Sequence, residues 1–389
     1  MVLGVKIEVV AGSSASALID PNAVRDIYVL GHSSGGNAEN HNTPVLLSGI
    51  SDIPSGASDT LTHALYGIFA VTGNSARVYF VQAIDTNASG SDEAKKLAHL
   101  TAAKNALLDN RSNYIQPGIL LYPEFSLMIT QDPTENINEK TKVFQALDEL
   151  CKKKSWLLFI NSSAGSASDA IKEAQVYNSS KFGNSAFYYG KATYPDPDDS
   201  QKTLSIPLAS LAAATVIVAT GLEGIAQPPA GVSYPLTGAS SITGLISLET
   251  EYTALQLAKV NFVTQVKNAG YCFWGSRTLA TDSKFQFINT RLVLNAIVEE
   301  LRNTMARFIQ EPLDPRGQTT ASLLAATTSV MQDAYNAGML SGRNIQEAYS
   351  VSIKESSSLY EIVMEIKVRP VYTVESITVS VINETVIAI

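Results

Sequence analysis

Hydrophobic and polar positions alternate with different periods along the chain, and the period predicts the element. Four short apolar runs are typical of strands that are buried on both faces. They cover residues 27–30, 78–81, 119–121 and 157–160. Helices are predicted at 93–108 and 139–152, and the small apolar residues of 206–220 predict a buried helix. Strands and helices in this order predict a mixed α/β body over residues 17–265.

The last third of the chain predicts two helices. Apolar residues recur at helical spacing in the first of them: Leu294, Ile297, Leu301, Met305 and Phe308. Polar residues take its other face: Arg291, Asn295, Glu299 and Arg302. This helix should end at Glu311, because the following Pro312 disfavours helical geometry in the residue before it. The second helix, over 319–337, should end at Gly338.

A strict alternation with a period of two follows the second helix. The segments 350–354 and 360–369 are joined by the serines of 356–358, which predicts a β-hairpin. One face of this hairpin is apolar, with the residues Val351, Ile353, Ile362, Met364, Ile366 and Val368.

Both ends of the chain also alternate like strands, but neither has a partner strand nearby in the sequence. The first end, 4–10, precedes a stretch of small residues, 11–16, and the last ends on apolar residues. Termini normally fray in water, so we expect both to dock elsewhere. The apolar residues expected to take part in strand exchange are Val5, Ile7, Val9, Ile377, Val379, Val381, Val386, Ile387 and Ile389. The expected organisation is an arm with its linker (1–16), an outer α/β domain (17–265), a C-terminal domain (266–376) and a second arm (377–389).

Composition narrows the classes of function. The 389 residues carry a net charge of −8, whereas proteins that bind nucleic acid are usually basic. No apolar run approaches the roughly 20 residues that span a bilayer, and the charged N-terminal segment resembles neither a signal peptide nor an anchor. Cys151 and Cys272 have apolar neighbours and are expected to be buried free thiols. No histidine has metal-ligand spacing, so we expect neither a metal nor a cofactor.

One motif points to an enzyme. Gly31-His32-Ser33-Ser34-Gly35 matches G-x-S-x-G directly after a predicted strand, as in the nucleophile elbow of serine hydrolases. An elbow requires a helix immediately after the serine, whereas residues 36–44 predict a loop. No histidine follows His99, so the usual order of acid and histidine downstream of the serine is missing. A Gly/Ser loop is the preferred interpretation, and a serine hydrolase that uses Ser33 is the alternative.

A second motif points to a structural protein. Residues 272–279, Cys-Phe-Trp-Gly-Ser-Arg-Thr-Leu, resemble the W-G-x-R-T-L signature of phage-type contractile tail sheath proteins. Segments at 254–261, 287–291, 308–314 and 337–342 resemble further family motifs in the family's order. Two positions depart from it: Leu292 replaces a usual arginine, and Leu313 replaces an asparagine. The matching motif residues are Trp274, Gly275, Arg277, Arg291, Glu311 and Pro312.

The resemblance implies a mechanical role without catalysis or cofactor. Subunits would form six-membered rings stacked helically around an inner tube, and each subunit would lend its terminal strands to the hairpins of its neighbours. The implied partners are copies of the chain, the inner tail tube protein, and baseplate and tail terminator proteins, with no nucleic acid and no insertion into a membrane. The sheath would assemble in a bacterial cytoplasm, on a virion tail or an injection particle, and contract once without consuming nucleotide.

Two expectations concern individual residues of the C-terminal domain. We expect 271–314 to be core, with Trp274 buried and both Arg277 and Arg291 paired with carboxylates or carbonyls. We also expect an exposed basic surface that faces the tube, with candidates Arg302, Arg307, Arg316 and Arg343.

Overall fold

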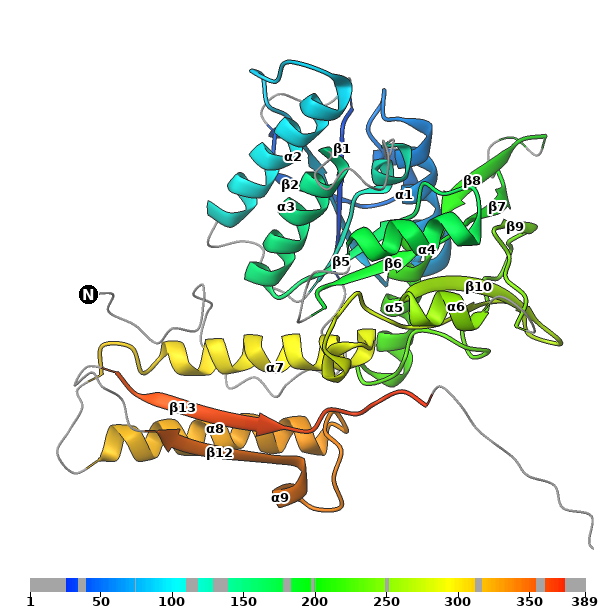
Figure 1. The fold of residues 1–389 in the computed structure, drawn as a ribbon. Coiled ribbons are helices and arrows are strands. Elements are labelled where there is room, and N and C mark those ends of the chain that lie inside the picture. Colours follow the sequence, from blue (N-terminus) through cyan, green and yellow to red (C-terminus); the bar gives the residue numbers. More distant parts are fainter. Residues whose placement is uncertain are drawn as a thin grey trace, which may run out of the picture.

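The computed structural model describes most of the chain and shows a layered α/β body with a second, smaller layer beside it (Figure 1). The description covers residues 26–33, 40–73, 75–109, 118–128, 139–177, 183–196, 199, 201–248, 252–311, 317–354 and 361–374. The two predicted arms lie outside the described residues.

The body is built on an eight-stranded sheet with the order β11-β10-β6-β5-β4-β1-β3-β2. Its six inner strands are parallel: β1 (Asp26–Gly31), β3 (Arg77–Gln82), β4 (Gly118–Leu121), β5 (Leu157–Asn161), β6 (Ser185–Tyr188) and β10 (Val260–Val266). The two edge strands are antiparallel to their neighbours: β2 (Pro44–Leu47) and β11 (Gly270–Trp274).

Helices cover both faces of this sheet, so successive strand residues are buried in different cores. In β1, Ile27 and Val29 belong to one hydrophobic cluster, and Tyr28 and Leu30 belong to the other. The first face packs against α1 (Asp59–Thr72) and α5 (Leu208–Glu223). The second face packs against α2 (Asp92–Asp109), α3 (Glu139–Lys154), α4 (Ala167–Val176) and α6 (Tyr252–Leu257). This double coverage explains the continuous apolar runs in the sequence.

Smaller elements complete the body. A three-stranded antiparallel sheet contains β7 (Lys191–Pro195), β8 (Thr203–Pro207) and β9 (Ser241–Thr243). Short 3-10 helices occur at Ile50–Asp52, Pro123–Leu127 and Ser283–Phe285.

The second layer consists of α7 (Ile288–Ala306), α8 (Gln318–Asn336), the short α9 (Ile345–Ala348) and a two-stranded sheet of β12 (Tyr349–Lys354) and β13 (Val363–Val368) (Figure 1). Apolar residues of α7 and α8 belong to the same hydrophobic cluster as the α1/α5 face of the main sheet. Body and C-terminal layer therefore share one continuous core.

Most sequence-based element assignments are confirmed. The four buried strands, the helices at 93–108, 139–152 and 319–337, the 350–369 hairpin and the two buried free thiols are all present. The helix expected over 206–220 is shorter at its start, because Ile206 and Pro207 still belong to β8 and α5 begins at Leu208. The domain boundary expected at 265/266 falls inside the β10–β11 hairpin, whose two strands both belong to the main sheet. The body thus extends to β11.

Trp274 was expected to be buried, and the structure shows it only partly buried. It ends the edge strand β11. The tryptophan at the centre of the fold is Trp156, which has an exposed fraction of 0%. Its indole stacks on the Tyr28 ring, with ring centroids 4.1 Å apart and an interplanar angle of 12°.

Trp156→Ala is therefore expected to lower the free energy of unfolding by about 3–5 kcal/mol, as large buried aromatic truncations do. Trp274→Ala should cost less than half as much, because less of its surface is removed from water in the native state. Urea unfolding followed by circular dichroism measures both, and Trp156→Phe is the control that retains an aromatic ring. Equal costs for the two alanine variants would contradict this assignment of the core.

Candidate functional site

The resemblance motif forms the junction between the body and the C-terminal layer. Gly275 has φ 124°, a conformation that L side chains rarely adopt, and an added Cβ would lie 3.1 Å from Oδ1 of Asn261. Asn261 is fully buried and holds the turn from both sides. Its side-chain amide donates to the carbonyl of Arg277 (2.7 Å), and its Oδ1 accepts from the Arg277 backbone N–H (2.7 Å).

Backbone hydrogen bonds extend this junction in two directions. The N–H of Leu279 donates to the carbonyl of Ser185 on β6 (2.8 Å). The N–H of Thr278 donates to the carbonyl of Gln286, and the N–H of Ile288 donates to the carbonyl of Ser276, both at 2.8 Å. The motif thereby ties the main sheet to the first residue of α7.

The two motif arginines differ in their partners. The Arg277 guanidinium lies over the Phe287 ring, 5.9 Å from its centroid. Arg291 lies 6.0 Å from the Phe285 centroid and interacts electrostatically with Asp148 of α3. Burial lowers the pKa of Arg291 to about 10, and the attraction of Asp148 opposes that shift. Asp148 is thus a carboxylate that attracts Arg291, and a direct pairing of the two stays a prediction.

The polar face of α7 is largely buried. Asn295, Glu299 and Arg302 are 1%, 6% and 7% exposed. Glu299 accepts a hydrogen bond from the Arg302 guanidinium at 2.9 Å. Lys154, the last residue of α3, is attracted by Glu299 and repelled by Arg302. We call these four residues the polar seam; it lies where α7 meets the body.

The polar seam is incompletely hydrogen-bonded. Within the described residues, Nζ of Lys154, Oε1 of Glu299 and Oδ1 of Asn295 are buried without a hydrogen-bond partner. Burial raises the pKa of Glu299 to about 7, although Arg302 and Lys154 favour its charged form. Burial likewise lowers the pKa of Lys154. Unsatisfied buried polar groups lower the free energy of unfolding, so the packing of α7 against the body is less stable at the polar seam than in the surrounding apolar core.

The two-stranded sheet presents one apolar and one polar face. Val351 pairs with Ile366, and Ile353 pairs with Met364, in antiparallel register. The apolar face packs towards α8, where the buried Thr327 hydroxyl lies 3.8 Å from the Met364 sulfur. The other face carries ion pairs of Glu365 with Lys354 (3.2 Å) and with Lys367 (3.5 Å). All six residues expected in the recipient hairpin lie in or beside β12 and β13: Val351, Ile353, Ile362, Met364, Ile366 and Val368.

Both edges of this sheet are open within the part of the chain that the structure describes. β12 pairs only with β13, and β13 only with β12. A two-stranded sheet is marginally stable by itself, and unpaired edges accept additional strands. The sheet therefore has the geometry of an acceptor for β-strands.

The chain leaves this sheet along a defined path. The N–H of Val371 donates to the carbonyl of Met339 (3.2 Å). At the start of α7, the Thr290 hydroxyl donates to the carbonyl of Val371 (3.2 Å), and the Thr373 hydroxyl donates to Oδ1 of Asn289 (3.0 Å). The segment that precedes the C-terminal arm is therefore fixed to the first turn of α7.

The four candidate tube-contact arginines do not form one exposed surface. Arg302 is buried in the polar seam, so its expected exposure is wrong. Arg307 and Arg343 are exposed, but Arg307 follows the end of α7 and Arg343 follows α8. α7 and α8 are consecutive, contacting helices, and α8 is about 28 Å long at 1.5 Å per residue. Arg307 precedes this helix in the chain and Arg343 follows it, so the two arginines lie towards its opposite ends. Arg316 lies outside the described residues.

The end of the family motif is also exposed. Glu311 and the neighbouring Ile309 are on the surface, so the expectation that all of 271–314 is core is wrong after the end of α7. Pro312 lies outside the described residues.

The geometry of Ser33 opposes the hydrolase alternative. The Ser33 side chain is buried, and its hydroxyl donates to the carbonyl of Ser55 at 2.6 Å. A hydroxyl that is committed to a backbone carbonyl is not activated by a base. Ser34 and Gly35 of the motif lie outside the described residues.

Within the described residues, no three acidic, histidine or cysteine side chains gather as a metal site would require. In the same part of the chain, no helix combines the length and apolar character needed to cross a bilayer.

An eight-stranded α/β body, joined through this motif to two helices and an open two-stranded sheet, is the fold of contractile sheath proteins. The helical sheath of the anti-feeding prophage in its contracted state superimposes with a TM-score of 0.70 at 19% identity, over 99% of this chain and 98% of that one. The contracted sheath complex of PVC, an extracellular contractile injection system, gives 0.67 at 16% identity, over 99% and 96%. A sheath tail protein from Listeria innocua gives 0.61 at 11%, over 92% and 96%. No protein-family model and no curated protein matches the chain. At these identities the likeness shows the fold.

Sequence reasoning missed two residues of α3 that interact with α7: Lys154 of the polar seam and Asp148, which attracts Arg291. Asp148 and Lys154 occur in a lysine-rich helix end that is typical of a solvated surface. The sequence signal that could have indicated them is the polar stripe of α7. A helix with one polar and one apolar face can bury both faces when each has a partner, so the polar stripe could have pointed to polar residues on another helix.

The polar seam predicts a pH-dependent stability. The pKa of Glu299 is raised by burial to about 7, so its contribution to stability is fully present below its ordinary pKa and is lost as the pH rises through about 7. Glu299→Gln keeps an acceptor for Arg302 but cannot ionise. Relative to this variant, the wild type should lose up to about 3 kcal/mol of unfolding free energy between pH 4.5 and pH 8.

Urea unfolding at several pH values measures the difference. The control is Glu347→Gln, because hydrogen bonds from Arg343 hold the pKa of this exposed carboxyl below its ordinary value and shift its effect to the acid side. Parallel pH profiles for the wild type and Glu299→Gln would contradict the assignment of the seam.

Proposed function

We propose that the chain is a subunit of a contractile tail sheath, which polymerises around an inner tube and contracts to drive the tube through a cell envelope. The observation that carries the proposal is the pairing of a sheath fold over nearly the whole chain with a C-terminal sheet whose edges are open. A polymer that must hold together while its subunits move needs contacts that tether without rigid packing, and open strand edges can supply them.

Strand exchange is the proposed linkage between subunits. The recipient sheet has one face packed on α8 and both edges free within the described residues, so each edge can accept one strand. The alternating arms 4–10 and 377–389 supply strands of suitable length and pattern. Each added strand would form roughly five backbone hydrogen bonds, worth about 0.5–1.5 kcal/mol net each, in addition to the burial of apolar residues.

The reach of the C-terminal arm supports exchange between neighbours. The chain is fixed to α7 up to Thr373, and residues 375–389 follow. At about 3.3–3.6 Å per residue this segment extends up to about 50 Å. That distance is enough to cross to the sheet of an adjacent subunit.

The proposed contraction requires no enzymatic step. In this proposal, six-membered rings stack helically around the tube, and the extended sheath is kinetically trapped above a more stable contracted packing. Two solved sheath structures with this fold are in contracted states, which supports a contractile role. Baseplate and tail terminator proteins would bound the polymer at its two ends.

Removing residues 1–12 or 382–389 should leave a folded monomer that no longer forms tubes, because each truncation removes strands that are lent to a neighbour. A matched pair of variants tests the mechanism without shortening the chain. Replacing Val5, Ile7 and Val9 by serine should prevent polymerisation, because these residues lie on the apolar face of the strand. Replacing Lys6 and Glu8 by serine should not, because these two lie on its polar face.

Negative-stain electron microscopy shows tubes, and circular dichroism verifies the fold of the monomer. Regular tubes from both truncated proteins would disprove strand exchange, although the sheath function could still hold through other contacts.

The exposed arginines are proposed to contact the tube as two separate points. Glutamate at both Arg307 and Arg343 should impair assembly on tubes by about ten-fold or more, with the loss largest at low salt, because exposed charge contacts are screened by ions. Glutamate at Lys172, an exposed residue of α4 in the body, is the control. Co-sedimentation with tubes at several salt concentrations measures the effect. Unchanged sedimentation at low salt would remove these two residues from the interface.

A further inference from the structure

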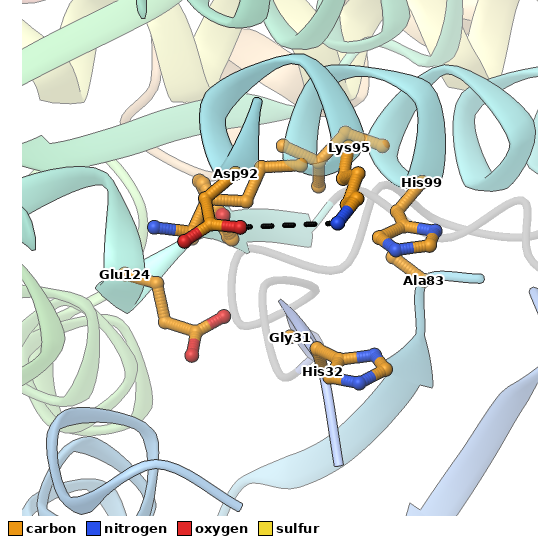
Figure 2. A pocket seen from close by; sticks show the side chains of 10 residues that line it. Gly31, His32, Ala83, Asp92, Lys95, His99 and Glu124 are labelled. Atoms are coloured by element: carbon orange, nitrogen blue, oxygen red, sulfur yellow. Dashed lines mark ion pairs between the residues drawn. The ribbon is translucent and has the colours of Figure 1, made fainter. Parts of the chain in front are cut away.

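A pocket lies at the carboxyl ends of three parallel strands, far in sequence from the sheath motif. It has a volume of about 220 Å³ and opens where β1, β3 and β4 end (Figure 2). β1 stands between β3 and β4 although these two follow each other in the chain order of parallel strands. The connections from one strand to the next therefore run to opposite sides of β1, and such a switch at the carboxyl edge of a parallel α/β sheet leaves a crevice that suits a ligand.

The walls of this pocket combine an apolar floor with six titratable side chains. The floor consists of the buried residues Ala83, Leu100 and Tyr122. The titratable side chains are His32, Asp92, Lys95, Lys96, His99 and Glu124. Lys95, Lys96 and His99 all belong to α2 and line the pocket. Figure 2 shows the Lys95 and His99 side chains extending from this helix.

His99 is fixed as a neutral hydrogen-bond donor. Its Nδ1 accepts a hydrogen bond from the backbone N–H of Asp85 at 2.7 Å, so the neutral ring carries its proton on Nε2. A proton on Nδ1 would oppose that N–H. The His99 ring stacks on His32 with centroids 5.5 Å apart, and burial, with help from His32 and Lys95, lowers the pKa of His99. His99 can therefore donate from Nε2 without being charged.

The ammonium groups of Lys95 and Lys96 have few partners among the described residues and can contact a ligand. Lys95 has only a long ion pair with Asp92, at 4.0 Å, and Asp92 is itself largely exposed. Lys96 has no hydrogen bond or ion pair with any residue that the structure describes. Against one carboxylate, Asp92, the same helix presents two ammonium groups and a neutral N–H donor, and this excess of donors favours an oxyanion.

The opposite wall carries a carboxylate. Glu124 is nine-tenths buried, and its Oε1 accepts a hydrogen bond from the Ser58 hydroxyl at 2.7 Å. Among the described residues, no donor is paired with its second oxygen, and the side chain points towards the pocket (Figure 2). A buried carboxylate repels a fully ionised anion but accepts a hydrogen bond from an acidic O–H.

We propose that this pocket binds a phosphate group that retains one P–OH, with Lys95, Lys96 and His99 on its charged oxygens and Glu124 accepting the hydrogen bond of the P–OH. Inorganic phosphate and a small phosphate monoester share this chemistry. Sulfate has the same shape and charge range but no proton at neutral pH, so it would leave Glu124 facing a bare oxygen. A site that requires a donor rejects an isostere that lacks one.

Isothermal titration of the full-length protein at pH 6 tests this inference with inorganic phosphate, glycerol phosphate and sulfate as probes. Phosphate should bind with one site per chain, and sulfate at least about ten-fold more weakly, since a hydrogen bond to a charged group is lost. If inorganic phosphate binds and glycerol phosphate does not, the ligand is the free ion. If both bind, the pocket accepts a monoester.

Two variants and one control assign the roles. Lys96→Met should weaken phosphate binding by about ten-fold or more. Glu124→Gln should raise sulfate affinity to that of phosphate, because an amide can donate to either anion. Lys172→Met removes an exposed ammonium from α4 and should change nothing. Circular dichroism verifies that each variant is folded.

Two results would overturn the inference. One is phosphate binding that does not saturate or that Lys96→Met leaves unchanged. The other is equal affinity of the wild type for phosphate and sulfate. Neither result bears on assembly into a sheath, because polymerisation is measured independently.

Discussion

Helix α7 has to bury two faces of opposite chemistry, and the rest of the C-terminal layer is arranged around that constraint. Its apolar face joins the hydrophobic core that runs from the main sheet to α8. Its polar face lies in the seam with Lys154. A helix in this position cannot rotate without exposing apolar residues or burying more charge. The junction at Gly275 and Asn261 fixes the start of the helix, and with it the direction of everything that follows.

Two buried lysine–glutamate groups in this protein show how hydrogen bonding separates a rigid joint from a weak one. Lys140 lies 2.6 Å from Glu173, and the Ser162 and Ser163 hydroxyls complete the group. In the polar seam, by contrast, Lys154 and Glu299 are left partly unsatisfied within the described residues. The first arrangement stabilises the body from within, whereas the second makes the attachment of α7 sensitive to the charge of one carboxyl group.

Local patterns in the sequence predicted much of this fold, because each buried strand and each long helix has a period that its own residues express. The hairpin of β12 and β13 was predicted for the same reason, since alternation shows on a sheet with one apolar face. The failures have a common cause: they depend on which element packs against which. Glu299 and Arg302 have the pattern of a surface, and only the position of α3 shows that they are buried. Trp274 is only partly buried because β11 is an edge strand, which depends on the strand order. The pocket beneath His99 likewise arises from three strands that are distant in sequence.

The fixed path of the chain after β13 has a mechanical consequence. Tension applied beyond Val374 first meets the side-chain hydrogen bonds of Thr373 and Thr290 at α7, and not the ladder between β12 and β13. These hydrogen bonds transmit the force to α7, so that the hydrogen bonds between β12 and β13 are not loaded. A sheet of only two strands can in this way stay paired while force is applied to the C-terminal segment of the subunit.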